Sequence, residues 1–402
     1  MARYDAIVAG AGPAGSTAAR LLAKRGASVL LLDKHRFPRD KPCGGGVTLR
    51  AASVQDVDLT PVVERTVHGV RFSLRLGQSF DRSYSKPLTY MTQRCNLDGL
   101  LARRAAEAGA TFHDGEAVRE VGAVETPRRP VRVITSSDTH DADILIAADG
   151  ANGITARSAG FTSRFEEAVA LEGNLPYSPD IPENWRDYIG LDLGGVAGGY
   201  GWVFPKGEHL NVGVGGWKYA AFTLRPKLGD LCRRYGFDAA RLDNLRGHHL
   251  PLRTAGAPIA RGPVALVGDA AGLVDPLSGE GIHMAFASGR LAAQHALRYL
   301  GCETNSMAAY ERAVDDELQP ELDVSRRLQE VFHLAPPPYL ALLRRNRKFW
   351  LFLCHLVRGE LTYLDFVRMI GPLRIALDLV AGVVRRRREA RVAALLPLLR
   401  GA

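Results

Sequence analysis

The sequence predicts an α/β fold in which a mostly parallel sheet carries an inserted antiparallel sheet and is followed by a helical region. Three observations lead to this prediction. The chain opens, over residues 4–33, with a strand, a glycine turn, a helix and a second strand. Residues 70–90 alternate loosely between apolar and polar side chains, and residues 168–217 are rich in glycine and aromatic residues. Both patterns are typical of antiparallel strands. From residue 291 onward the pattern is helical.

The first 33 residues have the pattern of a dinucleotide site. An apolar strand over residues 5–9 runs into Gly10, Gly12 and Gly15, spaced as G-x-G-x-x-G, and a helix follows. Asp33 ends the second strand, where an acidic side chain can accept a hydrogen bond from a ribose hydroxyl. The motif alone also describes an ordinary glycine turn. The flanking strand, helix and acid are what predict a Rossmann-like dinucleotide site.

The composition excludes several classes of protein. The 402 residues suggest two or three domains, or one large interrupted domain. The five cysteines have no C-x-x-C spacing, so we expect neither a disulfide framework nor a metal site, and a reducing cytoplasm fits. Asp5 interrupts the first apolar run, so no signal peptide is predicted. No apolar stretch reaches the roughly 20 residues of a membrane span.

The net charge of +9 lies wholly in the C-terminal segment. From Leu340 onward the chain has 13 Lys and Arg but four Asp and Glu. No nucleic-acid module accompanies this excess, so no nucleic-acid partner is expected. The apolar run at residues 349–353 lies beside Arg344, Arg345, Arg347 and Lys348, and another precedes Arg385–Arg388. This predicts peripheral contact with the anionic inner face of a membrane, and the alternative is a solvated basic face over a packed helical cap.

A glycine-rich loop after Asp33 could lie against a flat ligand. It begins at Lys34 and ends in Cys43-Gly44-Gly45-Gly46. Cys43 is either a group near a reactive ring or a small buried hydrophobe. Arg94, at the start of a helix predicted over residues 92–109, either reaches a cofactor phosphate or is solvated.

Two later strands end in acids at an edge where parallel sheets bind ligands. The strand over residues 142–148 runs into Asp149-Gly150, although this pair alone is more typical of a plain turn. The strand over residues 264–267 runs into Asp269, which can accept a hydrogen bond from a sugar hydroxyl. Pro276 and Gly279-Glu280-Gly281 then lead into a helix starting near Ile282, whose N-terminus favours anionic density.

The aromatic residues Tyr200, Trp202 and Phe204 alternate along one predicted strand and therefore share one face. Residues 210–215 form its hairpin partner. This face suits an apolar ligand, and core packing is the alternative.

Together these motifs resemble the flavoprotein superfamily of aromatic hydroxylases over roughly the first three quarters of the chain. Within it, the sequence is most similar to the geranylgeranyl reductase family. Residues 38–46, PRDKPCGGG, are similar to the family's P-x-x-K-x-C-G-G. Residues 200–206, YGWVFPK, resemble its Y-x-W-x-F-P-K substrate motif.

The resemblance implies a Rossmann-like FAD-binding domain of the glutathione-reductase or aromatic-hydroxylase type, with FAD bound in extended form. The implied FAD contacts are Gly10, Gly12, Pro13, Ala14, Gly15, Asp33, Lys34, Cys43, Gly44, Gly45, Arg94, Asp149, Gly150, Asp269, Pro276, Gly279, Glu280, Gly281 and Ile282. The implied prenyl pocket is formed by Gly44, Gly45, Tyr200, Trp202, Phe204, Pro205 and Lys206. Gly153 stands where the superfamily usually has Ser or Thr, which makes Asp149 the weaker contact.

The implied activity is reduction of isolated C=C bonds in a polyprenyl chain by hydride from flavin N5. Cys43, Tyr200 and Trp202 are the implied catalytic residues: the rings stabilise developing positive charge, and the thiol or water gives the proton. Lys206 either holds a diphosphate or lipid headgroup, or caps the hairpin in solvent. The electron donor is NAD(P)H, ferredoxin or a quinol, since the chain has one G-x-G-x-x-G.

Two other functions fit the same motifs. A monooxygenase or halogenase acting on a lipophilic aromatic would use the same cofactor contacts, and a prenyl-lipid carrier would use the fold without catalysis. The predicted FAD domain comprises residues 1–65, 90–165 and 255–300. The predicted substrate domain comprises residues 66–89 and 166–254, and residues 301–402 form the helical region.

Overall fold

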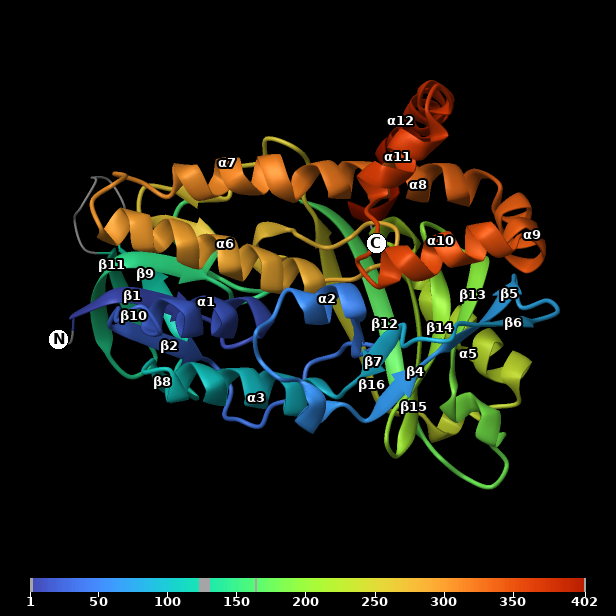
Figure 1. Cartoon of the computed structure of the whole chain (residues 1–402), viewed down its shortest axis with the longest axis horizontal. Coiled ribbons are helices and arrows are strands. Elements are labelled where there is room, and N and C mark those ends of the chain that lie inside the picture. The colour runs from blue at the N-terminus through green and yellow to red at the C-terminus, as the bar shows by residue number, and fades with distance from the viewer. Residues whose placement is uncertain (1–2, 123–130, 163–164, 401–402) are drawn as a thin grey trace.

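The computed structural model describes residues 3–122, 131–162 and 165–400, and it confirms the predicted fold class (Figure 1). A largely parallel sheet and a largely antiparallel sheet lie next to each other along the long axis of the molecule. The helices of the C-terminal region extend over both.

The first sheet follows from strands that are buried on both faces. Its strand order is β17 (Ala260–Arg261), β18 (Val264–Leu266), β11 (Thr139–Ala147), β1 (Arg3–Ala9), β2 (Val29–Asp33) and β8 (Thr111–Asp114). In addition, β10 (Val131–Thr135) pairs with β11, and β9 (Val118–Val121) pairs with β10. Strands β18, β11, β1, β2 and β8 are parallel. Every residue of β2 is buried, because helices cover one face and the β9–β10 ribbon covers the other.

Helices α1 (Pro13–Ala23), α3 (Arg94–Glu107) and α6 (Ile282–Leu300) pack on this sheet. Small residues let α1 and α6 approach closely. A Cβ at Gly289 on α6 would lie 2.4 Å from the Ala14 carbonyl oxygen on α1. The short helix α4 (Thr155–Ser158) follows β11.

The second sheet has the strand order β16 (Asp243–Leu252), β12 (Glu166–Pro176), β15 (His209–Trp217), β14 (Gly199–Pro205), β13 (Tyr188–Val196), β5 (Gly69–Leu74) and β6 (Phe80–Ser83). Residues on β14 alternate between two faces. Val203 packs towards α5 (Leu224–Tyr235), whereas Trp202 faces the first sheet. A small sheet of β3 (Gly46–Thr48), β7 (Thr89–Met91) and β4 (Arg65–Val67), with α2 (Leu49–Ser53), lies between the two.

The C-terminal helices are α7 (Ala308–Glu317), α8 (Gln319–Leu334), α9 (Pro336–Arg345), α10 (Arg347–Val357), α11 (Tyr363–Ile370) and α12 (Leu373–Arg400). The expectation that residues 349–353 face a membrane is wrong for Trp350, which is buried with its ring 6.2 Å from that of Phe72 on β5. Arg388 is not a free cation either, because it pairs with Glu166 and Glu330. Within the described ranges, no helix has the length and apolar character needed to cross a bilayer.

Candidate functional site: a cavity between the two sheets

A continuous cavity of about 830 Å³ joins the glycine turn of the first sheet to the C-terminal helices. One end is formed by the turn after β1 and by Asp33, and the middle by the Cys43 loop and the aromatic residues of β14. Apolar side chains form the other end: Val70, Phe72, Leu88, Ile189, Leu191, Trp350, Leu353, Leu356 and Val357. The cavity therefore has a polar end and an apolar end, with Cys43 between them.

The three motif glycines have different roles in the turn. A Cβ at Gly10 (φ +110°) would lie 2.3 Å from the Ala148 carbonyl oxygen, and one at Gly15 would lie 1.9 Å from the Gly10 carbonyl oxygen. Gly12 instead opens onto the cavity. A Cβ at Gly12 would have Nη2 of Arg39 at 3.6 Å and Nη2 of Arg94 at 3.9 Å as its nearest neighbours. A bare backbone at a helix N-terminus facing two guanidinium groups fits a pyrophosphate.

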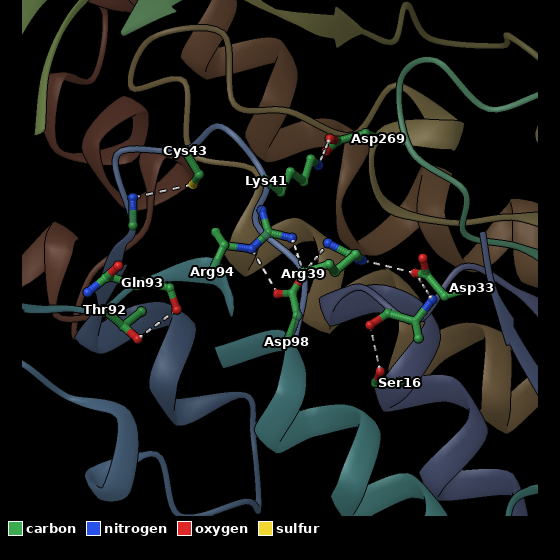
Figure 2. Close-up of polar contacts among 12 residues, drawn as sticks. Ser16, Asp33, Arg39, Lys41, Cys43, Thr92, Gln93, Arg94, Asp98 and Asp269 are labelled. Carbon is green, nitrogen blue, oxygen red and sulfur yellow. Dashed lines mark hydrogen bonds and ion pairs between the residues drawn. The ribbon is translucent and has the colours of Figure 1, made fainter. Parts of the chain in front are cut away.

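A buried carboxylate, Asp98 on α3, holds these two arginines (Figure 2). It accepts two hydrogen bonds from Arg94, at 2.8 and 2.7 Å, and an ion pair from Arg39 at 2.9 Å. Although burial opposes the charge, Asp98 raises the pKa of Arg94 above its ordinary value. Arg94 is 5% exposed, so the alternative of a solvated helix-start residue is wrong.

Asp33 lies beside this group at the polar end of the cavity. Its Oδ2 accepts hydrogen bonds from the Ala11 N–H at 3.0 Å and from Arg39 Nε at 3.2 Å. The sequence reading missed Arg39 and Asp98. Asp98 follows Arg94 by four residues on one helix, and this spacing is the sequence feature from which their ion pair could have been predicted.

Asp269 lines the same cavity as Asp33 and has two basic neighbours that were not expected at the site. Its Oδ2 is 2.9 Å from Lys41 Nζ and 3.6 Å from His248 Nε2. Burial alone would raise the pKa of Asp269, but Lys41 and His248 hold it well below its usual range. The carboxylate therefore remains charged and able to accept from a hydroxyl.

The turn before α6 also forms part of the cavity wall, through Pro276, Gly279, Glu280, Gly281 and Ile282, the residues expected to contact FAD. Burial raises the pKa of Glu280 to about 7, and its carboxylate accepts from the Thr48 hydroxyl at 2.5 Å. Gly281 leaves room beside Asp269, since a Cβ there would lie 3.2 Å from Asp269 Oδ1.

Asp149 and Gly150 are part of the wall, but the Asp149 carboxylate turns into its own loop. Its Oδ2 accepts from the Thr155 N–H at 2.9 Å. A Cβ at Gly153 would lie 2.1 Å from the Asp149 Cγ, so glycine at this position makes room for the carboxylate. Burial raises the pKa of Asp149.

Tyr200, Trp202 and Phe204 share the cavity face of β14, as their alternation predicted. The centroids of neighbouring rings are 6.1 and 6.2 Å apart. The Trp202 Nε1 donates to Asn211 Oδ1 at 2.7 Å, and the Tyr200 hydroxyl donates to the Ser278 carbonyl. Phe204 packs on Gly44, where a Cβ would lie 2.8 Å from the ring.

Lys206 does not cap the hairpin in solvent, and that alternative is wrong. Its side chain is 2% exposed and donates to the carbonyl oxygens of Gly44 and, at 2.8 Å, Thr92. Burial lowers the pKa of Lys206 to about 8. Neither Pro205 nor Lys206 is among the cavity-lining residues, whereas Cys43, Gly44 and Gly45 are. Lys206 thus fixes the Cys43 loop from behind.

We expect Lys206→Met to lower the free energy of unfolding by about 2 kcal/mol, because two buried carbonyls lose a charged donor. The loosened loop should also expose Cys43, so a maleimide should react with it faster. Equilibrium denaturation and thiol labelling measure both effects, with Lys218→Met as the control, since Lys218 forms an exposed pair with Glu167. Unchanged stability and labelling would contradict a loop-fixing role.

His113, Glu116 and His140 form a group that could hold a metal ion, which the sequence reading did not anticipate. Glu116 is 2.9 Å from a ring nitrogen of each histidine and accepts from the Thr135 hydroxyl at 2.6 Å. These hydrogen bonds are enough to explain why the three side chains lie together.

Comparison with known proteins agrees with this geometry. Residues 3–187 match the family of FAD binding domains. Menaquinone reductase from Mycolicibacterium smegmatis is 34% identical, over 81% of this chain and 84% of that protein. The chloroplastic geranylgeranyl diphosphate reductase of Nicotiana tabacum is 31% identical, over 82% of this chain and 75% of that protein.

A solved structure from Thermoplasma acidophilum, a geranylgeranyl bacteriochlorophyll reductase-like protein, superposes with a TM-score of 0.72 at 28% identity. The match covers 82% of this chain and 87% of the other. The pyrophosphate cradle at Gly12 and the acids Asp33 and Asp269 fit the FAD that these relationships imply. The chain is therefore an FAD-dependent oxidoreductase that belongs to the geranylgeranyl reductase family.

Proposed function

We propose that the protein reduces isolated C=C bonds in a polyprenyl chain carried by a lipid, a quinone or a diphosphate. The continuity of the cavity, from the FAD cradle past Cys43 to the apolar end at α10, is the observation that supports this most directly. The names of the relatives, menaquinone reductase and geranylgeranyl diphosphate reductase, support a prenyl substrate. When bound and reduced, FAD supplies hydride chemistry.

In this proposal the protein binds the chain and stabilises charge. The apolar end of the cavity excludes water and holds isoprene units against Phe72, Leu191 and Trp350. Protonation of an isolated alkene places positive charge on a tertiary carbon. The faces of Tyr200 and Trp202 can each stabilise that charge by about 0.5–2 kcal/mol in a dry site.

The test is an anaerobic single turnover. The purified protein is reduced with dithionite and mixed with geranylgeranyl diphosphate or a menaquinone, and the product is analysed by mass spectrometry. Flavin reoxidation with a product gain of one H₂ per turnover would support the proposal. If the flavin reoxidises only when air is admitted, and oxygen or halogen enters a product, the proposal is overturned in favour of a monooxygenase or halogenase.

We propose further that the protein docks peripherally on the anionic inner face of a membrane, through the α12 patch. We define this patch as the exposed apolar residues Leu373, Ile375, Leu379, Val380 and Val383 of α12, together with Met369 at the end of α11. The exposed cations Arg385, Arg386 and Arg387 follow it directly on α12. Helix α12 protrudes from the body of the molecule (Figure 1), and an apolar face followed by arginines suits an anionic lipid surface.

The double variant Ile375→Ser, Leu379→Ser should bind vesicles containing phosphatidylglycerol at least about 10-fold more weakly, since it removes two apolar anchors. Co-sedimentation measures the affinity. Phe222→Ser is the control, because Phe222 is exposed but is not one of the patch residues. Wild-type binding that is equal for phosphatidylglycerol and neutral phosphatidylcholine, or absent for both, would overturn the docking proposal.

A further inference from the structure

Glu172 on β12 is a buried acid in the wall of the same cavity, and none of the motifs includes it. Glu172 is only 7% exposed. Glu172 lies opposite Gly213 on β15, and Gly213 lies opposite Trp202 on β14. In antiparallel strands directly opposite residues point to the same face, so Trp202 and Glu172 belong to one row that faces the cavity.

The glycine in the middle of this row is needed. A Cβ at Gly213 would lie 2.1 Å from Cζ2 of Trp202, because the indole lies over the backbone at that position. No side chain therefore separates the indole face from the Glu172 strand. A positively charged carbon held against Trp202 would have the carboxyl group of Glu172 as its neighbour in the row.

The surroundings of Glu172 favour its protonated form. Within the described part of the chain, no Lys, Arg or His nitrogen lies within 4 Å of its carboxyl oxygens. Its hydrogen-bond donors are neutral: Oε1 accepts the Cys43 N–H at 2.5 Å, and the Asn211 side chain is a second donor. Lys206 donates to two carbonyls instead, and Arg246, opposite Glu172 on β16, pairs with Asp40 at 3.1 Å. Burial raises the pKa of Glu172 to about 7, partly offset by the Cys43 N–H and by Lys206.

We propose that Glu172 is the acid that protonates the substrate alkene, an inference that rests on the proposed function. The π bond breaks, one carbon gains the proton of the Glu172 carboxyl group, and the other gains the hydride supplied by reduced FAD. Two C–H bonds form, FAD is left oxidised, and Glu172 is left as a carboxylate that recovers its proton from solvent. Cys43 then acts as a positioning residue, because its main-chain N–H orients the carboxyl group.

The decisive variant is Glu172→Gln, since the amide oxygen can still accept the Cys43 N–H but the side chain has no acidic proton. Anaerobic flavin reoxidation by the prenyl substrate should slow on the order of 10²-fold, the contribution of a general acid. Glu172→Asp should recover part of the rate. The wild-type rate should fall as the pH rises through about 7, because the acid loses its proton, and this dependence should vanish in Glu172→Gln.

A second readout does not depend on turnover. Infrared difference spectra should show protonated carboxyl absorption that titrates near pH 7, and Glu172→Gln should remove the part of this signal that Glu172 contributes. Glu280 and Glu330, whose pKa values burial also raises to about 7, should keep their own part of the signal in that variant. The matched control is Glu167→Gln on the same strand, whose carboxylate pairs with Lys218 at the surface, and it should change neither readout.

The outcomes separate the two proposals. Wild-type protein that reduces no prenyl compound overturns the proposed function and this inference with it. Wild-type activity that survives in Glu172→Gln, or a titrating carboxyl signal of the same size in that variant as in the wild type, overturns the assignment of Glu172 alone. If Cys43→Ala instead abolishes turnover while Glu172→Gln retains it, the thiol is the donor and Glu172 is not.

Discussion

Replacing Asp98 by alanine is expected to lower the free energy of unfolding by about 3–5 kcal/mol, because it leaves buried guanidinium charge without its partner. Asp98 is fully buried and holds both Arg39 and Arg94. Without it, Arg94 loses its carboxylate partner and Arg39 keeps only Asp33, so both are held less firmly beside Gly12 and FAD affinity should fall as well. Equilibrium denaturation, followed with and without added FAD, measures both effects.

Asp141→Ala is the matched control for this prediction. Asp141 makes the same two-bond contact with an arginine, Arg132, at 2.9 and 3.1 Å, but the arginine side chain is 53% exposed. An exposed pair of this kind contributes about 0–1 kcal/mol. If both variants lost the same small amount of stability, burial of Asp98 would not be what makes its ion pairs strong.

Gly12→Asp should give a folded protein that is purified without its yellow cofactor. Gly12 has φ −79°, a backbone conformation open to any residue, and a Cβ would meet nothing closer than 3.6 Å. The added carboxylate would pair with Arg39 and Arg94 and repel a pyrophosphate. Losing these charge-assisted contacts should weaken FAD binding at least about 100-fold, or roughly 3 kcal/mol.

Two alanine variants in the same turn separate the effect of an added charge from the effect of an added side chain. Gly12→Ala should fold normally but bind FAD more weakly, since its methyl group lies where the backbone must approach the pyrophosphate. The loss should be smaller than for Gly12→Asp, which also adds a repelling charge. Gly15→Ala should destabilise the fold itself, since its Cβ would lie 1.9 Å from the Gly10 carbonyl oxygen. Flavin absorbance per protein and thermal unfolding report the two effects. Tight FAD binding by Gly12→Asp would exclude this turn as the pyrophosphate site.

The sequence by itself determined the features that depend on residues close along the chain. The turn at Gly10, Gly12 and Gly15 needs bare backbone at fixed spacing, and Asp33 follows from the length of one helix and one strand. Alternation of Tyr200, Trp202 and Phe204 placed three rings on one face, because side chains alternate in any strand. These local rules hold whatever the rest of the chain does.

Only the tertiary structure decided which charges are buried and which groups meet across the fold. Asp98 holds Arg39, 59 residues earlier, and Glu172 meets the Cys43 N–H from 129 residues away. Lys206 looks like a surface lysine in the sequence but is buried, and Trp350 looks like a membrane anchor but packs against Phe72. Burial and long-range pairing depend on how the sheets and helices stack, and no local periodicity encodes that.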